Sequence, residues 1–333
     1  MQQLSATKNY MPVALLHGIF SNAQAMKPIK DTLEKQFPGI YVHIIKYGNS
    51  EIIASVTSPK YQLELIHKNI MSNVILKNNK FILIGHSQGG LLARCWMQKY
   101  CNPQNPWVHT LISLGAPQNG FYGIPTDFDE NITKYWESSR ESSAARVFYT
   151  VLKECLEVDR DNAYKKFYNK TFQSTISFAN YWKDPVHYDD YCKNCKFLSK
   201  FNNETDHDHA ADYKENINTL ENFVLVKSYN DEIIEPQESC HMLFYKQGSN
   251  AEHDIEKDFT QTAQYTKNLL GLKTLYDSQR LHFKEVACRH TEFQTDAAVA
   301  SIIAGYIRVA QTRVHDENYN DQIPPKISCC TLV

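Results

Sequence analysis

The chain has 333 residues, a formal net charge of −2 and a pI near 6.7, so its overall charge offers no attraction to nucleic acid or to anionic membranes. No apolar run approaches the ~20 residues of a membrane-spanning helix, and the mean hydropathy is −0.48. A chain of this length can bury a full core, either as one domain with insertions or as two domains.

The N-terminus lacks the basic stretch followed by an apolar stretch that marks a secretory signal peptide. Its apolar run, residues 12–16, predicts a first strand instead, so the chain as given leaves a cytoplasmic location open. The nine cysteines do not decide the compartment, because a chain of this size does not need disulfides to fold.

Short apolar runs alternate with amphipathic stretches along the chain. This rhythm predicts an α/β fold, with repeated strand–helix units around a mostly parallel central sheet flanked by helices. Strands are expected at residues 13–16, 40–45, 81–84, 108–114, 223–226 and 282–286. Helices are expected at residues 23–37, 61–76, 91–97, near 261–270 and at 296–309.

The stretch from residue 118 to residue 213 interrupts this rhythm. It is rich in tyrosine, serine, lysine and charged residues, and its helical patterns are broken. We expect a helical cap inserted over the sheet edge, within a single domain that spans residues 1–310; ordinary packing helices of one compact domain are the alternative. Residues 311–333 are expected to form a polar tail outside the core.

The segment Gly85-His86-Ser87-Gln88-Gly89 stands between a predicted buried strand and a predicted helix. Glycines two residues before and two after a serine, in this strand–turn–helix context, are typical of the nucleophile elbow of α/β-hydrolases. The serine sits on a sharp, strained turn, and side chains at the two glycine positions would collide with it. Ser87 is therefore the predicted nucleophile, although a serine turn without catalytic role has the same outline.

A serine hydroxyl needs a base to take its proton and an acid to hold that base. α/β-Hydrolases place the three in the order Ser, Asp or Glu, His, with the last two after later strands. Asp231 follows the strand at 223–226, with Glu232 as a competitor, and His290 follows the strand at 282–286. By order alone, His253 and His282 also compete for the role of base.

Acyl transfer also needs two N–H groups that converge on the oxyanion. The backbone of Gln88, directly after the nucleophile, is expected to supply one. The backbone of Ile19, or of a neighbour in the loop after the first strand, is expected to supply the other, and His17 is expected to orient that loop.

No metal or organic cofactor is expected. The alternating Asp and His residues at 206–209 lie in a polar stretch and would divide between two faces of a strand. Cys192-x-x-Cys195 lacks the second pair of a zinc ribbon, so a disulfide or two free thiols is the favoured interpretation.

Longer blocks of sequence narrow the family. They are GHSQGG with the following LLAR (85–94), LISLGAPQNGFYGIP (111–125), ANYWKDP (179–185), NFVLVKSYNDEIIEPQES (222–239) and LGLKTL (270–275). With His-Gly after the first strand, these blocks resemble the palmitoyl-protein thioesterases, lysosomal α/β-hydrolases that remove fatty acyl groups from cysteine. The residues around His290 and the LGLKTL block resemble the second lysosomal paralogue, which favours acyl-CoA-type thioesters.

The resemblance implies the same three catalytic residues that chain order indicates. It also implies that Phe121, Tyr122 and Ile124 line a groove for the fatty chain, and that the substrate is an S-acylated protein or peptide, or an acyl-CoA. A departure is the long segment between residues 125 and 179, which bears on groove shape. An oxygen-ester lipase or esterase, or a catalytically silent acyl-binding protein on the same fold, are the alternatives.

The resemblance further implies the lysosome or the secretory pathway as the location. Three Asn-x-Thr sequons, at Asn131, Asn169 and Asn203, are consistent with secretion as a glycoprotein. They support it only weakly, because about this number arises by chance in a chain so rich in Asn, Ser and Thr. The oligomeric state is open.

Overall fold

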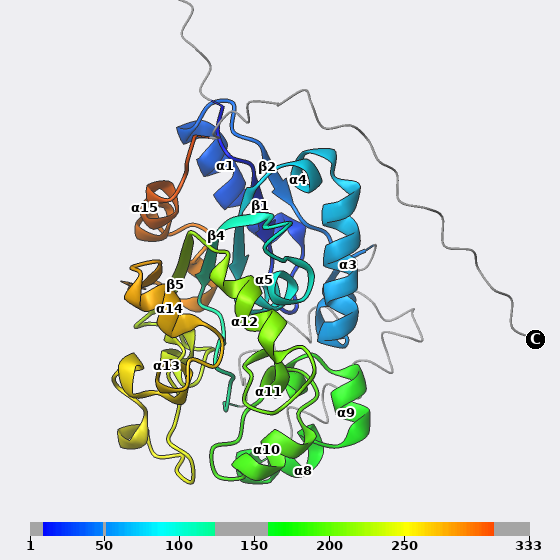
Figure 1. Cartoon of the computed structure of the whole chain (residues 1–333), viewed down its shortest axis with the longest axis vertical. Coiled ribbons are helices and arrows are strands. Elements are labelled where there is room, and N and C mark those ends of the chain that lie inside the picture. Colours follow the sequence, from blue (N-terminus) through cyan, green and yellow to red (C-terminus); the bar gives the residue numbers. More distant parts are fainter. Residues whose placement is uncertain (1–8, 49–50, 124–158, 310–333) are drawn as a thin grey trace, which may run out of the picture.

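Six strands form one parallel sheet in the computed structural model, which describes residues 9–48, 51–123 and 159–309 (Figure 1). The strands are β1 (Val13–Leu16), β2 (Val42–Ile44), β3 (Phe81–His86), β4 (Val108–Leu114), β5 (Asn222–Ser228) and β6 (Leu281–Val286). Their order in the sheet is β2-β1-β3-β4-β5-β6, and every neighbouring pair is parallel. The predicted α/β fold with its six strands is confirmed.

The inner strands β1, β3 and β4 are almost entirely buried because helices cover both faces of the sheet, whereas the edge strand β6 carries exposed Lys284 and Glu285. In β3, Ile82 and Ile84 pack in a cluster with residues of α1 (Lys27–Gln36) and α15 (Ala297–Gly305). Phe81 and Leu83 face the opposite side, where α3 (Pro59–Ser72), α5 (Gln88–Tyr100) and α12 (Ala210–Asn218) pack. The alternation of buried residues along each strand therefore builds two cores, one on each face.

Shorter helices complete the fold. They are α2 (Glu51–Val56), α4 (Val74–Asn78), α8 (Ala163–Phe167), α9 (Lys170–Thr175), α10 (Tyr188–Asn194), α11 (Leu198–Phe201), α13 (Ala263–Thr266) and α14 (Leu272–Asp277). Single turns of 3-10 helix lie at Ala23–Met26, Arg160–Asn162, Phe178–Asn180, Gln237–His241, Glu252–Asp254, Phe259–Gln261 and His290–Glu292.

Local chemistry explains where the helices differ from expectation. The predicted helix at 61–76 divides at Asn73, whose side chain accepts hydrogen bonds from two N–H groups at the start of α4. The prediction of one helix near 261–270 is wrong. There the chain makes only α13 and then takes left-handed backbone angles at Asn268 (φ 47°) and Gly271 (φ 81°), which end a helix.

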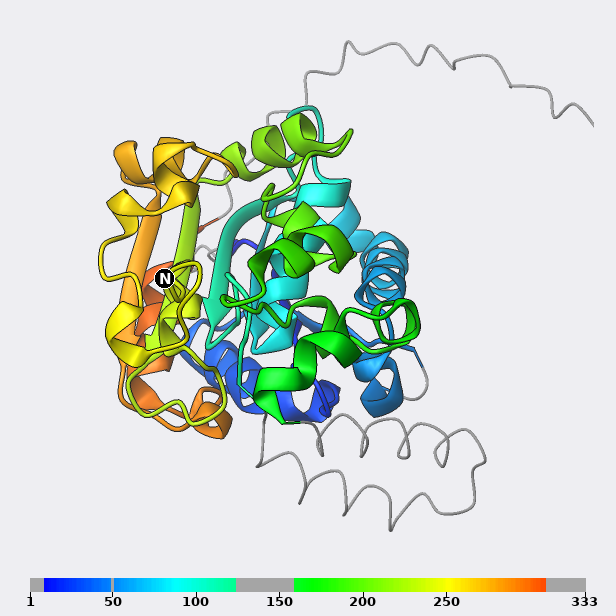
Figure 2. The same cartoon turned by 90° about the horizontal axis from the view of Figure 1, so that it is seen from below.

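The helices α8–α11 gather at one end of the molecule, beyond the sheet (Figures 1 and 2). They lie in the interval between β4 and β5 where the cap is expected. Their aromatic side chains, Phe167 and Tyr191 among them, belong to the same buried cluster as the α3 and α5 face of the sheet. Ile124 and the rest of residues 124–158 lie outside the described residues, as does the expected tail. Among the described residues, no helix combines the length and apolar character needed to span a membrane.

Candidate active site

Ser87 is the single residue between the end of β3 and the start of α5. Its backbone angles, φ 54° and ψ −133°, belong to a region that a non-glycine residue occupies only under strain. The turn is held because the Ser87 N–H donates to the Leu114 carbonyl at 2.8 Å. A Cβ at Gly85 would lie 2.4 Å from the Gly89 carbonyl oxygen, and one at Gly89 would lie 2.4 Å from the His17 carbonyl oxygen. Only glycine therefore fits at these two positions of the elbow.

The imidazole of His290 reaches Ser87 from the end of β6. Its Nε2 lies 2.9 Å from Ser87 Oγ, and both residues are buried. Two carboxylates hold the backbone of this segment: Glu232 accepts from the His290 N–H at 3.0 Å, and Glu292 accepts from the Arg289 N–H at 2.8 Å. The ring is thus placed to accept the serine proton.

Asp231 completes the hydrogen-bonded chain from the loop after β5. Its Oδ2 lies 2.8 Å from His290 Nδ1, and its Oδ1 accepts from the N–H groups of Ile233 and Ile234 at 2.9 and 3.0 Å. Burial by itself raises the pKa of Asp231, but attraction to His290 and these hydrogen bonds outweigh it and bring the pKa below its ordinary value. The carboxylate therefore stays ionised and can stabilise a protonated imidazole.

The competing residues lie elsewhere. Glu232 contacts the backbone of His290 and the guanidinium of Arg289, not the imidazole. His253 is largely exposed and lies beside Asp254, and His282 contacts Asn222 through its Nε2. Of the predicted candidates, the structure brings only Ser87, Asp231 and His290 together.

His86, which sequence reasoning did not single out, holds the backbone of His290 through a hydrogen bond. Its Nε2 donates to the His290 carbonyl at 2.9 Å, and its Nδ1 accepts from the Gln294 amide at 2.8 Å. Burial and the nearby His290 lower the pKa of His86 to about 3. The ring therefore stays neutral. In the sequence, the one feature that pointed to a role for His86 was its position directly before the nucleophile.

The loop after β1 lies directly against the nucleophile. A Cβ at Gly18 would come within 2.8 Å of Ser87 Cβ and 3.3 Å of Ser87 Oγ. Among the described residues, no acceptor receives the backbone N–H of Ile19 or of Gln88. These two N–H groups are the ones predicted to bind the oxyanion, and both belong to segments that meet at Ser87. His17 is fully buried and holds the loop through Tyr47, whose hydroxyl donates to the His17 carbonyl at 2.9 Å.

A small apolar cavity opens beside the Ser87 hydroxyl. Its volume is about 20 Å³, and the described residues that line it are Ile19, Ser87, Pro117, Phe121, Phe178, Tyr181, Ile233 and Ile234. Of the residues predicted to line the acyl groove, Phe121 lies at this cavity, and its role stays a prediction. Tyr122 is not among these lining residues and packs between Trp182 and Tyr245. Ile233 and Ile234 stand two and three residues after the predicted acid, and this short separation was the signal for them in the sequence.

The described cysteines form no disulfide, and the histidine side chains at 206–209 make ordinary polar contacts. Cys192 and Cys195 are free thiols, as are the other four cysteines within the described part of the chain. In the segment at 206–209, His207 contacts the Lys200 carbonyl and Asn203, and His209 lies beside Asp212. No group of three potential metal ligands occurs among residues 9–48, 51–123 and 159–309.

The parallel sheet, with Ser87 after its third strand, Asp231 after its fifth and His290 after its sixth, defines the α/β-hydrolase fold. Comparison with known proteins specifies the family. The sequence profile described as palmitoyl protein thioesterase matches residues 12–290, so the chain belongs to this family of thioester hydrolases.

Curated relatives cover most of the chain. Palmitoyl-protein thioesterase 3 of Dictyostelium discoideum is 35% identical over 289 residues, which is 87% of each chain. Palmitoyl-protein thioesterase 1 of Caenorhabditis elegans is 30% identical over 312 residues, covering 91% of this chain and 93% of its own. The lysosomal thioesterase PPT2 homolog of Drosophila melanogaster is 28% identical over 278 residues, 84% of each chain. These identities are close to one another, so they do not show whether the chain is nearer to the palmitoyl-protein thioesterases 1 and 3 or to PPT2.

Proposed function

We propose that this chain hydrolyses long-chain fatty acyl thioesters, palmitoyl thioesters in particular, through an acyl-Ser87 intermediate. The observation that carries the proposal is the hydrogen-bonded chain from Ser87 Oγ through His290 to the ionised Asp231. Membership of the palmitoyl protein thioesterase family supports the substrate class. The acyl donor would be an S-acylated protein or peptide, or an acyl-CoA.

The geometry suits a two-step acyl transfer. Ser87 Oγ bonds to the thioester carbonyl carbon while its proton passes to His290 Nε2. The C–S bond then breaks, and His290 returns the proton to the departing sulfur. In the second step His290 takes a proton from water, the water oxygen bonds to the acyl carbon, and the bond to Ser87 breaks with the proton returned to Oγ. Asp231 stabilises the imidazolium in both steps.

The negative charge that forms on the carbonyl oxygen requires two donors. The Ile19 and Gln88 N–H groups fit this role, because they lie on the two segments that meet at Ser87 and have no acceptor among the described residues. Gln88 is the first residue of α5, so the positive end of that helix also favours the charge.

The fatty chain would lie against the apolar residues next to Ser87. The cavity of about 20 Å³ is the size of roughly one water molecule, so an acyl chain needs its lining side chains to separate. Phe121 lines this cavity and is proposed as part of the groove. The roles expected for Tyr122 and Ile124 stay predictions.

We propose the lysosome or the secretory pathway as the location, on the basis of the Drosophila relative named as a lysosomal thioesterase. A cytoplasmic enzyme is the alternative. Fractionation of cells that express the tagged chain decides between them: co-sedimentation with lysosomal markers supports the proposal, and recovery in the cytosol alone rejects it.

The test of function compares two substrates and two proteins. Wild-type protein should hydrolyse a palmitoyl thioester faster than the matching oxygen ester, and Ser87→Ala should lose both activities. A preference for the oxygen ester would instead identify a lipase or esterase with the same triad. A silent acyl-binding protein would show no turnover and no labelling by a fluorophosphonate, whereas the proposal requires labelling that Ser87→Ala abolishes.

A further inference from the structure

We propose that Ser55 is a positioning residue that holds both donor segments of the proposed oxyanion hole, the Ile19 segment and the Gln88 segment. The inference rests on the proposed function, because it concerns how the Ile19 and Gln88 N–H groups are aimed. Ser55 lies in α2 and is fully buried. Its hydrogen bonds go to residues other than Ser87 and His290, so its contribution would act through the two donor segments.

The Ser55 side chain holds the first donor segment, which contains Ile19. Its Oγ accepts from the Phe20 N–H at 2.9 Å and donates to the Ile52 carbonyl at 2.7 Å. Phe20 directly follows Ile19 and takes a left-handed backbone conformation, with φ 53°. A side chain other than glycine adopts this conformation only where the surroundings hold it. The hydroxyl therefore anchors the strained residue next to the first oxyanion donor.

The Ser55 backbone holds the second donor segment, which begins at Gln88. Its carbonyl accepts from Gln88 Nε2 at 2.6 Å and from Gln62 Nε2 at 3.0 Å. The remaining polar bonds of the Gln88 side chain go to Gln62 Oε1, at 3.0 Å, and to the Tyr181 hydroxyl, at 3.0 Å. Both amide hydrogens and the amide oxygen of Gln88 are thus engaged, which fixes the residue whose own N–H is the second donor.

Ser55 consequently links the loop after β1 to the start of α5 by direct hydrogen bonds. Neither Ser55 nor Gln62 exposes any surface to solvent, and Gln88 exposes about 1%. Water cannot easily replace the lost hydroxyl at such a position. Without the hydroxyl, the Ile19 segment can shift relative to Gln88, and small shifts of transition-state donors are costly to the rate.

The experiment compares Ser55→Ala with Ser199→Ala. Ser199 is another fully buried serine, in α11, and its hydroxyl donates to the Cys195 carbonyl. We expect Ser55→Ala to lower kcat on a palmitoyl thioester by about 10- to 100-fold with KM changed less than twofold. The affinity for an alkyl trifluoromethyl ketone, which forms a tetrahedral adduct with an oxyanion, should fall by a similar factor. Ser199→Ala should keep wild-type kcat even where both variants lower Tm equally.

Ser55→Cys provides a second route, because sulfur keeps the shape of the side chain but accepts hydrogen bonds weakly. It should fold and reproduce the loss of kcat. Wild-type kcat in Ser55→Ala or Ser55→Cys would overturn the inference, as would a loss confined to KM or an equal loss in Ser199→Ala. Failure of the proposed function looks different: the wild-type protein itself would show no thioesterase turnover, would prefer the oxygen ester, or would keep its turnover in Ser87→Ala.

Discussion

His86 makes the stability of this protein depend on pH in a defined window. Its Nδ1 accepts a hydrogen bond from Gln294 and its pKa is lowered to about 3, so the folded protein keeps the ring neutral. In the unfolded chain the same imidazole takes up a proton near its ordinary pKa of about 6.5. Between these values the unfolded state binds the additional proton, and stability therefore falls as the pH drops from about 6.5 toward 3.

We predict that His86→Gln flattens this dependence. Glutamine can still donate to the His290 carbonyl but cannot be protonated. The free energy of unfolding, measured in urea at several pH values, should fall less steeply with acid in the variant. Part of the slope should remain, because burial also lowers the pKa of His241 to about 4. His253→Gln, which alters a histidine whose side chain is 82% exposed, should retain the wild-type slope. Identical slopes in wild type and His86→Gln would contradict the prediction.

The sequons differ in how their asparagines are engaged. Asn169 is exposed, and its side-chain oxygen caps α9 while no described residue accepts from its Nδ2. Asn203 donates from Nδ2 to the carbonyls of Ala210 and Leu269, at 2.8 and 2.9 Å. A glycan on Nδ2 leaves one hydrogen there, so it would cost Asn203 one of these two bonds. In protein secreted from eukaryotic cells, glycopeptide mass spectrometry should find Asn169 occupied and Asn203 largely free; the reverse pattern would contradict this.

At the scale of elements, the nucleophile elbow depends on glycine for space. Gly89→Ala should destabilise the protein by about 1–3 kcal/mol and reduce thioesterase activity, because the new methyl group would meet the His17 carbonyl oxygen and move the elbow. Gly305→Ala is the matched control. It adds a methyl group with nothing within 4 Å at the end of α15, so it should be neutral or slightly stabilising. Urea unfolding and activity per folded molecule measure both, and wild-type behaviour of Gly89→Ala would contradict the account.

The elements that the sequence predicted well are those with strong local signals. The run of four apolar residues before Gly85 indicated β3, and the same reasoning located β4 to the residue. The elbow motif indicated Ser87, chain order together with the family resemblance indicated Asp231 and His290, and the fold brings all three within hydrogen-bonding distance. Their catalytic roles remain predictions.

Other features could not be foreseen because they depend on tertiary contacts. No helix was expected at α2, whose Ser55 gains significance only from segments far along the chain, such as Gln88. The neutrality of His86 depends on burial and on the nearby His290, more than 200 residues away. The break after α13 depends on left-handed residues that the apolar pattern does not reveal.

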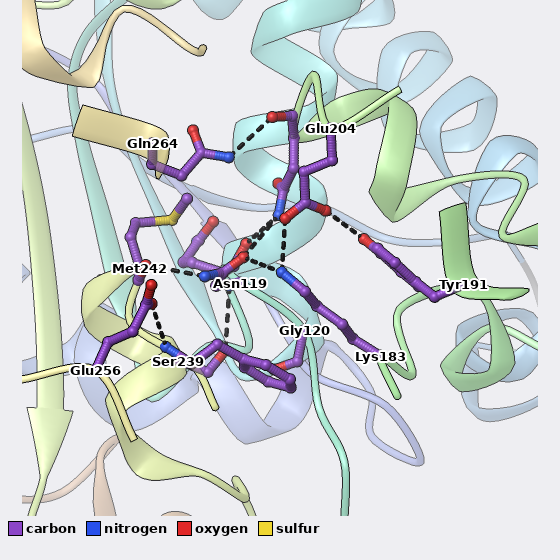
Figure 3. Close-up of polar contacts among 12 residues, drawn as sticks. Asn119, Gly120, Lys183, Tyr191, Glu204, Ser239, Met242, Glu256 and Gln264 are labelled. Atoms are coloured by element: carbon purple, nitrogen blue, oxygen red, sulfur yellow. Dashed lines mark hydrogen bonds and ion pairs between the residues drawn. The ribbon is translucent and has the colours of Figure 1, made fainter. Parts of the chain in front are cut away.

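At the scale of the whole molecule, a buried polar network joins the cap to the loops of the sheet. Figure 3 shows Lys183 pointing toward Glu204 and Asn119. Lys183 Nζ lies 2.6 Å from Glu204 Oε1 and 2.9 Å from Asn119 Oδ1, and the side chains of the ion pair are 6% and 7% exposed. The Tyr191 hydroxyl donates to the other oxygen of Glu204, while Asn119 donates to the Met242 carbonyl beyond β5. Groups from three parts of the chain thus form hydrogen bonds and an ion pair with one another.

This network predicts that cap and sheet unfold together as one domain. Lys183→Met should lower the free energy of unfolding by about 3–5 kcal/mol, because it leaves the Glu204 carboxylate buried without its counter-ion. The double variant Lys183→Met with Glu204→Leu should recover part of the loss. Lys273→Met, which removes an exposed pair with Asp277, should change stability by less than about 1 kcal/mol. Urea denaturation should show a single transition, and two separate transitions in wild type would contradict a single domain.

The acyl group is proposed to pass through Ser87, and trapping the acyl-enzyme reveals whether it does. Wild-type protein is mixed with a palmitoyl thioester, quenched in acid within milliseconds and digested for mass spectrometry. We expect a palmitoyl group on the peptide that contains Ser87, formed with a burst of free thiol, and neither adduct nor burst in Ser87→Ala. Release of thiol without acylation of Ser87, or a palmitoyl group on another residue that turns over at the catalytic rate, would contradict it.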